Sequence, residues 1–128
     1  MSSKLRPKPP EEAAHATSRA QSDRRELHHA EQLSALGHPV RLKILRFVVQ
    51  AGAEGAAAGD IQAHVDLPAS TLSHHLKRLA DAGIITSRQE GTFHYYGADY
   101  PSLRTLTDYL WEDCCARGTS TKKGSSCC

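Results

Sequence analysis

All four cysteines of this chain lie within its last fifteen residues. Cys114 and Cys115 are adjacent, and so are Cys127 and Cys128, while the spacing CxxC is absent. Neighbouring thiols suit a soft, thiophilic ion that takes few ligands, and they are also open to oxidation. These residues therefore predict either capture of such an ion or reversible formation of disulfides.

A second group of polar side chains lies on a segment with leucines at helical spacing. Leu72, Leu76 and Leu79 would face inward, and Gly83 follows in the usual position for the end of a helix. The side chains off this stripe are Ser70, Thr71, Ser73, His74, Lys77 and Arg78. Hydroxyl and imidazole groups can address base edges, and the two cations suit phosphates. An ordinary solvated face of an amphipathic helix is the alternative, whereas His75 is expected to be a packed, hydrogen-bonded histidine.

The elements that must position these groups follow from periodicity and from turn and capping signals. We expect a first helix that begins at a capping box at Asp23 and ends at Leu36, and a second helix that begins at Pro39. A Gly/Ala loop over 51–59 should lead to a short helix over 60–65 and a longer helix over 69–82. Strands over 84–88 and 93–97 and a last helix from Pro101 to near Gly118 complete the chain of elements. The short helix, turn and longer helix predict a helix-turn-helix, and the hairpin supplies a wing. Arg88 and His94 on that hairpin could contact the flanking DNA backbone.

The predicted fold class is therefore mainly α with a small β-hairpin, a winged helix-turn-helix. Residues 1–22, with three prolines and mixed charges, predict a disordered arm. Residues 23–117 would form the DNA-binding and dimerisation domain, and 118–128 a flexible tail that bears cysteines.

Composition limits the kind of protein. The 128 residues carry a net charge of +2, and residues 31–100 have six basic and seven acidic side chains. With no overall positive field, DNA binding must come from locally grouped cations and specific contacts. There is no N-terminal apolar run and no stretch of about 18 apolar residues, so we expect a cytoplasmic protein without a membrane span and with reduced thiols.

Three stretches carry a family resemblance: LSALGHPVRLKILRFV, LPASTLSHHLKRLADAGII and SRQEGTFHYYGA. In this order they resemble the arsenic-repressor (ArsR/SmtB) family of winged-helix regulators, over roughly residues 31–116. The resemblance implies a homodimer joined by the first and last helices, which binds an inverted-repeat operator and represses adjacent genes. By position it implies groove contacts from Ser70, Ser73 and His74. Thr92 stands where wings of the family often have an arginine, which predicts a weaker wing contact.

The resemblance also narrows the sensing site. The best-known arsenic site of the family is a CxC pair at the start of the short helix, where this chain has GAAAGDIQAHV without cysteine. A zinc site of the family uses Asp and His of the last helix, and here that helix offers acidic residues but no histidine. The run WEDCCARG resembles arsenic-responsive repressors with vicinal cysteines at the end of the last helix. The implied inducer is As(III) or Sb(III), held by Cys114, Cys115 and either Cys127 or Cys128.

Two alternatives remain beside the metalloid repressor. The first is the same repressor sensing oxidants or reactive sulfur species through its thiols. The second is a thiol-based metal-transfer or reductase protein, but the chain lacks a GxGxxG motif and a catalytic CxxC, so an enzyme with a cofactor is not expected. Since successive residues of a helix point in different directions, both sulfurs are expected to meet one ion only if the helix end frays or shifts at residues 116–118.

Overall fold

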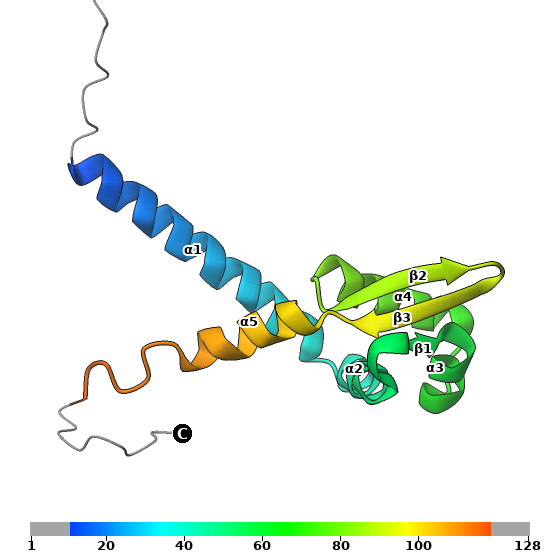
Figure 1. Cartoon of the computed structure of the whole chain (residues 1–128). Coiled ribbons are helices and arrows are strands. Elements are labelled where there is room, and N and C mark those ends of the chain that lie inside the picture. Colours follow the sequence, from blue (N-terminus) through cyan, green and yellow to red (C-terminus); the bar gives the residue numbers. More distant parts are fainter. Residues whose placement is uncertain (1–10, 119–128) are drawn as a thin grey trace, which may run out of the picture.

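The computed structural model describes residues 11–118, with side chains from residue 16 onward. Its elements are α1 (Glu11–Leu36), α2 (Pro39–Ala51), the 3₁₀ helix η1 (Gly52–Glu54), β1 (Ala56–Ala57), α3 (Ala58–Val65), α4 (Ala69–Asp81), β2 (Ile85–Glu90), β3 (Phe93–Ala98) and α5 (Tyr100–Trp111). Figure 1 shows α1 as a long rod that leaves the body, with α5 starting beside its C-terminal half and the β2–β3 wing at the opposite end. The prediction of a mainly helical fold with a hairpin is confirmed.

The first helix begins well before the predicted capping box. It starts at Glu11, so Asp23 lies inside α1 and the predicted start of the helix was wrong. Residues 11–22 of the predicted disordered arm are therefore helical. The segment EEAAHATSRAQS has neither glycine nor proline and is rich in alanine and other good helix formers, which explains the longer helix. Residues 1–10 of the predicted arm lie outside the described residues.

The core lies where α2, α3 and α4 meet the base of the wing. Ile44 and Val48 from α2, Ile61 from α3 and Leu79 from α4 are all fully buried, together with Ile84 at the entrance to the wing. The burial of Leu79 was predicted from the leucine stripe of α4, because side chains at positions i, i+3 and i+4 share one helix face. Packing of these aliphatic side chains holds the helix-turn-helix and the wing together as one unit.

The wing contains a third strand that the sequence did not predict. The sheet has the order β1-β3-β2, with Ala56 paired to Tyr96 and Ala57 to Tyr95. This short strand lies within the segment that was predicted to be a Gly/Ala loop. Gly55 precedes it at φ +78°, and a Cβ there would lie 2.6 Å from the Tyr96 carbonyl oxygen. The glycine therefore allows the backbone of this segment to approach β3 closely.

The last helix ends earlier than predicted. α5 stops at Trp111, not near Gly118, and residues 112–118 form a series of turns. Glu112 leaves the helix with ψ 136°, and Asp113 and Cys115 have positive φ values of 56° and 66°. Left-handed residues cannot continue a right-handed helix, so the backbone turns away at this point. We call residues 112–118 the cysteine turn.

Candidate nucleic-acid interface and thiol site

The helix-turn-helix is built by a left-handed residue and a side-chain bond. α3 ends at Val65, the following Asp66 has φ 53°, and the Asp66 backbone N–H donates to the Gln62 carbonyl at 2.8 Å. The Gln62 side chain donates from Nε2 to the Leu67 carbonyl at 3.1 Å. Pro68 then leads directly into α4. Together these contacts fix the angle at which α4 leaves the turn.

α4 has one buried face and one polar exposed face. Leu72, Leu76 and Leu79 are buried, as predicted. All six predicted DNA-contact residues of this helix are exposed: Ser70, Thr71, Ser73, His74, Lys77 and Arg78. The structure thus brings these side chains together on one accessible element, while their contact with DNA stays a prediction.

The two cations of α4 contact different partners within the protein. Lys77 Nζ lies 3.2 Å from Asp81 Oδ2, with 73% and 62% of the two side chains exposed. Arg78 Nη2 is 3.5 Å from the Ser34 hydroxyl oxygen of α1. An exposed ion pair of this kind contributes little stability, so Lys77 can exchange its carboxylate for a phosphate at low cost.

Arg88 of the wing is engaged with three protein partners. Its Nη2 donates to the Glu54 carbonyl at 3.2 Å, and its Nε lies 2.9 Å from Glu90 Oε1. The guanidinium carbon also lies 4.9 Å from the centroid of the Tyr95 ring. A phosphate would have to compete with these contacts, and the contact of Arg88 with DNA stays a prediction.

His94 lies on the other face of the wing. In the register of the hairpin, Arg88 pairs with Tyr95 and His94 pairs with Gln89. Cross-strand partners share a face and successive residues alternate, so the two predicted wing residues point to opposite sides of the sheet. The ring of His94 stacks on Tyr96 at 4.7 Å and remains exposed. The structure does not bring Arg88 and His94 into one patch.

His75 occupies the junction between α2 and α4, where it is half-buried. Its ring centroid is 4.9 Å from that of His38, and Arg41 Nη1 lies 3.5 Å from His75 Nδ1. Burial, followed by the nearby His38, Arg41 and His74, lowers the pKa of His75 below its usual value. Because the guanidinium can only donate, Nδ1 acts as an acceptor and the imidazole is neutral in this contact. The expected packed, hydrogen-bonded histidine is thus found at the junction of the two helices.

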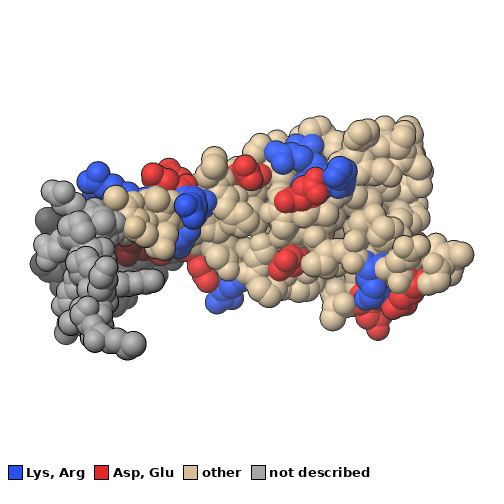
Figure 2. Space-filling view, turned by 90° about the horizontal axis from the view of Figure 1, so that it is seen from above, with Lys and Arg blue, Asp and Glu red and all other residues tan. Residues whose placement is uncertain are grey.

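The charged side chains are scattered across the visible surface. Figure 2 shows Lys and Arg side chains beside Asp and Glu side chains, without a continuous basic face in that view. This fits the near-neutral middle of the sequence. DNA affinity would then depend on a few local cations rather than on a broad field.

The cysteine turn holds two sulfurs close together. Cys114 Sγ lies 3.6 Å from Cys115 Sγ, and both residues are exposed. The turn is held by short backbone bonds, from Cys114 N–H to the Trp111 carbonyl at 3.1 Å and from Gly118 N–H to the Cys115 carbonyl at 2.9 Å. The predicted helix around the two cysteines is absent, because α5 has already ended at Trp111 and Cys115 is left-handed, and the sulfurs come close in this non-helical turn. Cys127 and Cys128 lie outside the described residues.

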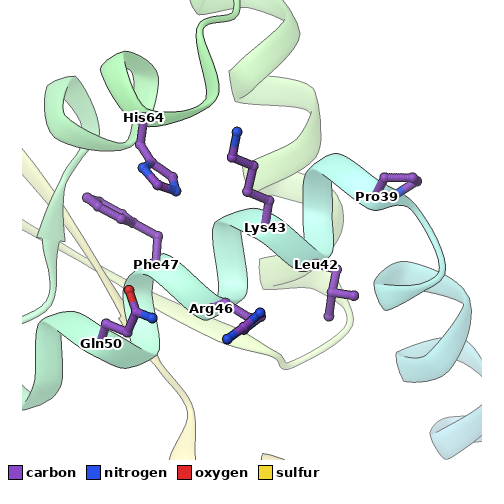
Figure 3. Close-up of a pocket in the computed structure, with 7 residues that line it drawn as sticks. All are labelled: Pro39, Leu42, Lys43, Arg46, Phe47, Gln50 and His64. Atoms are coloured by element: carbon purple, nitrogen blue, oxygen red, sulfur yellow. The ribbon is translucent and has the colours of Figure 1, made fainter.

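A hollow on the outer side of α2 was not foreseen from the sequence. It has a volume of about 410 Å³. It is lined by Pro39, Leu42, Lys43, Arg46, Phe47, Gln50 and His64. Figure 3 shows Phe47 extending beside His64 of α3, and their rings stack at 4.3 Å. None of the residues predicted to contact DNA or metal lines this hollow.

Helices α2, α3 and α4 form one unit, α4 exposes a polar face, and the β2–β3 hairpin adjoins it. This arrangement defines a winged helix-turn-helix DNA-binding domain. The helix-turn-helix domain family matches residues 36–88. A protein of Halobacterium salinarum, provisionally named an arsenical resistance operon repressor, is 39% identical over 64 residues, which are 50% of this chain and 53% of that protein. The chain thus spans about half the length of that relative.

A second relative extends the match over nearly a whole protein. The arsenical resistance operon repressor of Bacillus subtilis is 31% identical over 99 residues, which cover 77% of this chain and 90% of the relative. The solution structure of a homodimeric winged helix-turn-helix domain from Mycobacterium bovis superposes with a TM-score of 0.58 at 23% identity, covering 80% and 94% of the two chains. The chain belongs to the ArsR family, a family of DNA-binding transcriptional repressors and not of enzymes. No helix within residues 11–118 is long and apolar enough to cross a membrane.

Proposed function

We propose that this protein is a homodimeric repressor that releases its operator when As(III) or Sb(III) binds the thiolates of the C-terminal cysteines. The observation that supports it most directly is the 3.6 Å separation of the Cys114 and Cys115 sulfurs. Metal–thiolate bonds are about 2.3 Å long for zinc, so one ion of comparable bond length can contact both sulfurs from this arrangement. The names of the two arsenical resistance relatives agree with this inducer.

The third ligand would come from the distal pair. Trivalent arsenic and antimony favour three thiolates in a pyramid, and within residues 11–118 no group of three or more potential ligands forms a metal site. Cys127 or Cys128 would complete the set. The proposal therefore assigns Cys114 and Cys115 as the fixed part of the site and one distal thiol as the closing ligand.

Operator binding would use the exposed face of α4. Its hydroxyls and imidazole suit base edges, and Lys77 and Arg78 suit phosphates. Two copies related by a two-fold axis would read an inverted repeat, since the symmetry of the protein is matched by that of its DNA site.

Exposed apolar side chains support the homodimer. On α1, Leu27 and Leu33 are 62% and 43% exposed, and on α5, Leu110 and Trp111 are 53% and 61% exposed. Large apolar side chains gathered on two helices favour burial against a partner. The Mycobacterium bovis domain, which shares the fold, is homodimeric. We infer that α1 and α5 supply the dimer interface.

The test combines operator binding with removal of the paired thiols. Labelled operator DNA is titrated with reduced protein, without oxygen, and the Kd is measured by fluorescence anisotropy with and without arsenite. The wild type should lose about 5–150-fold in affinity, the usual range for allosteric coupling. The variant carrying Cys114→Ser and Cys115→Ser should bind the operator and no longer respond.

A matched variant with Cys127→Ser and Cys128→Ser separates the two pairs. It should show a weaker response that needs more arsenite, because two thiolates remain. Full arsenite release of the variant without Cys114 and Cys115 would refute the proposed site.

Thiol oxidation is the second candidate trigger. The adjacent sulfurs of Cys114 and Cys115, 3.6 Å apart and exposed, are also open to oxidation, which favours a redox response. If arsenite leaves the reduced complex intact while peroxide or a persulfide disrupts it, the regulator senses oxidants or reactive sulfur and not metalloids.

A further inference from the structure

Arg25 of α1 forms an ion pair with Glu112, the first residue of the cysteine turn. Its Nη2 lies 3.3 Å from both Glu112 carboxylate oxygens, and its guanidinium carbon lies 5.4 Å from the centroid of the Tyr109 ring. Glu112 is two residues before Cys114. A residue far away in the sequence is thus tied to the segment whose geometry any thiol ligand would change.

One helical turn further along α1, two polar side chains are almost completely buried. His29 is 3% exposed and Gln32 is 0% exposed. The His29 ring packs on Tyr109 at 4.5 Å, and His29 Nδ1 lies 3.0 Å from Gln32 Oε1. Because the amide oxygen can only accept, His29 Nδ1 carries the proton in this bond. Gln32 Nε2 then donates to Ser102 Oγ at 2.8 Å.

The chain of contacts continues to the end of the recognition helix α4. The Ser102 backbone N–H donates to Asp99 Oδ1 at 3.1 Å, and the Asp99 N–H donates to the Ile84 carbonyl at 3.0 Å. The Ile84 N–H in turn donates to the carbonyl of Leu79, in the last turn of α4, at 3.0 Å. Figure 1 shows α5 starting where the wing ends, close to the C-terminal half of α1.

We propose that Arg25, His29 and Gln32 are positioning residues that couple the cysteine turn to the recognition helix. The inference rests on the proposed function in placing the effector at Cys114 and Cys115. Drawing those thiols around an ion rearranges a turn that contains two left-handed residues, and this displaces Glu112 from Arg25. The change passes along α1 to Ser102 and so to the end of α4.

The interior part of this path is buried. Hydrogen bonds in a low-dielectric interior are strong, and an unsatisfied partner there is costly. The bonds that join His29, Gln32 and Ser102 are therefore costly to break, whereas the exposed Arg25–Glu112 pair can separate and take water, and it is the contact that a change in the cysteine turn would open. Coupling is reciprocal for binding free energies, so operator binding must also bias the cysteine turn.

The first test measures how strongly arsenite weakens operator binding. The variants are Arg25→Gln, which cuts the path at the surface, and Gln32→Met, which cuts it in the interior. Arg104→Gln is the matched control, because Arg104 makes an exposed ion pair with Asp108 at 3.4 Å within α5. Arsenite binding itself is followed by ultraviolet absorption of the arsenic–thiolate bonds.

The path predicts at least a fivefold smaller arsenite effect on the operator Kd in both variants, with arsenite still bound to the thiols. Arg104→Gln should keep the full wild-type effect. If both path variants are released from DNA as fully as the wild type, the coupling path is refuted. Thermal unfolding of each variant identifies loss of folding, and Arg25→Gln, at an exposed site, remains informative if Gln32→Met fails to fold.

The second test does not depend on arsenic. Trp111 is the only tryptophan of the chain, is 61% exposed and directly precedes Glu112, so its fluorescence reports on the start of the cysteine turn. Adding operator DNA should shift its emission in the wild type and in Arg104→Gln, and the shift should be lost in Arg25→Gln. An unshifted wild type, or an equal shift in Arg25→Gln, overturns the inference. Wild-type protein that ignores arsenite but shows the operator-dependent shift would instead refute the proposed inducer and keep the coupling.

Discussion

Replacing Lys77 by glutamine should reduce the salt dependence of operator binding. Lys77 is an exposed cation of α4 that forms a surface ion pair with Asp81. Breaking such a pair costs about 0.2–1 kcal/mol, so DNA can recruit the ammonium group readily. Arg88 differs from Lys77 in having two further protein contacts beside its ion pair.

The magnitude follows from counterion release. Each phosphate neutralised contributes about −0.9 to the slope of log K against log salt. A homodimer presents two copies of Lys77, and the slope should therefore become shallower by about 1.8. Between about 50 and 200 mM salt this corresponds to roughly a twelvefold smaller loss of affinity.

The assay is anisotropy of labelled operator at a series of salt concentrations. Arg104→Gln is the control here as well, because it breaks an exposed pair of the same i,i+4 type on α5, away from the recognition helix. It should leave the slope as in the wild type. A Lys77→Gln protein with an unchanged slope would show that α4 does not lie against phosphates at this position, and the proposed orientation of the helix would be wrong.

Three further changes test the core, the wing and the histidine junction. Leu79→Ala removes a fully buried side chain and should lower the free energy of unfolding by about 2–5 kcal/mol in urea titrations. Gly55→Ala puts a Cβ 2.6 Å from the Tyr96 carbonyl oxygen at φ +78°, so thermal unfolding should show a lower Tm. Because burial and nearby cations lower the pKa of His75 from 6.5, the unfolded chain takes up a proton first as the pH falls below about 6.5, and stability decreases. Urea midpoints at a series of pH values should show that His75→Asn makes this decrease smaller, whereas an unchanged pH dependence would contradict the assigned role of the junction.

The helix-turn-helix was predictable because each of its parts is specified locally. Leu72, Leu76 and Leu79 repeat at helical spacing, and the structure buries all three. Gly83 follows α4 at φ +74°, as a helix end of this kind requires. With the leucines buried, the polar side chains on the other side of α4 must face outward. These features depend on local periodicity and helix capping and not on contacts with distant segments.

The features that were missed depend on contacts between distant segments or on weak end signals. The pairing of Ala56 with Tyr96 joins segments forty residues apart, and two alanines carry no strand pattern of their own. His29 and Gln32 carry no sequence signal for burial, and only packing against α5 accounts for it. The opposed directions of Arg88 and His94 required the hairpin register.

The early end of α5 changes how a thiol site could act on DNA. Had Cys114 and Cys115 been helical, ligand binding would have had to unwind the helix, and unwinding itself would have been the signal. In the structure the helix ends at Trp111 and the sulfurs are already 3.6 Å apart. Binding then needs only a small rearrangement of a turn, which by itself leaves α5 in place. A regulator of this design needs a separate contact that detects the rearrangement, and Glu112, held by Arg25 next to the cysteines, is the side chain in the right position to provide it.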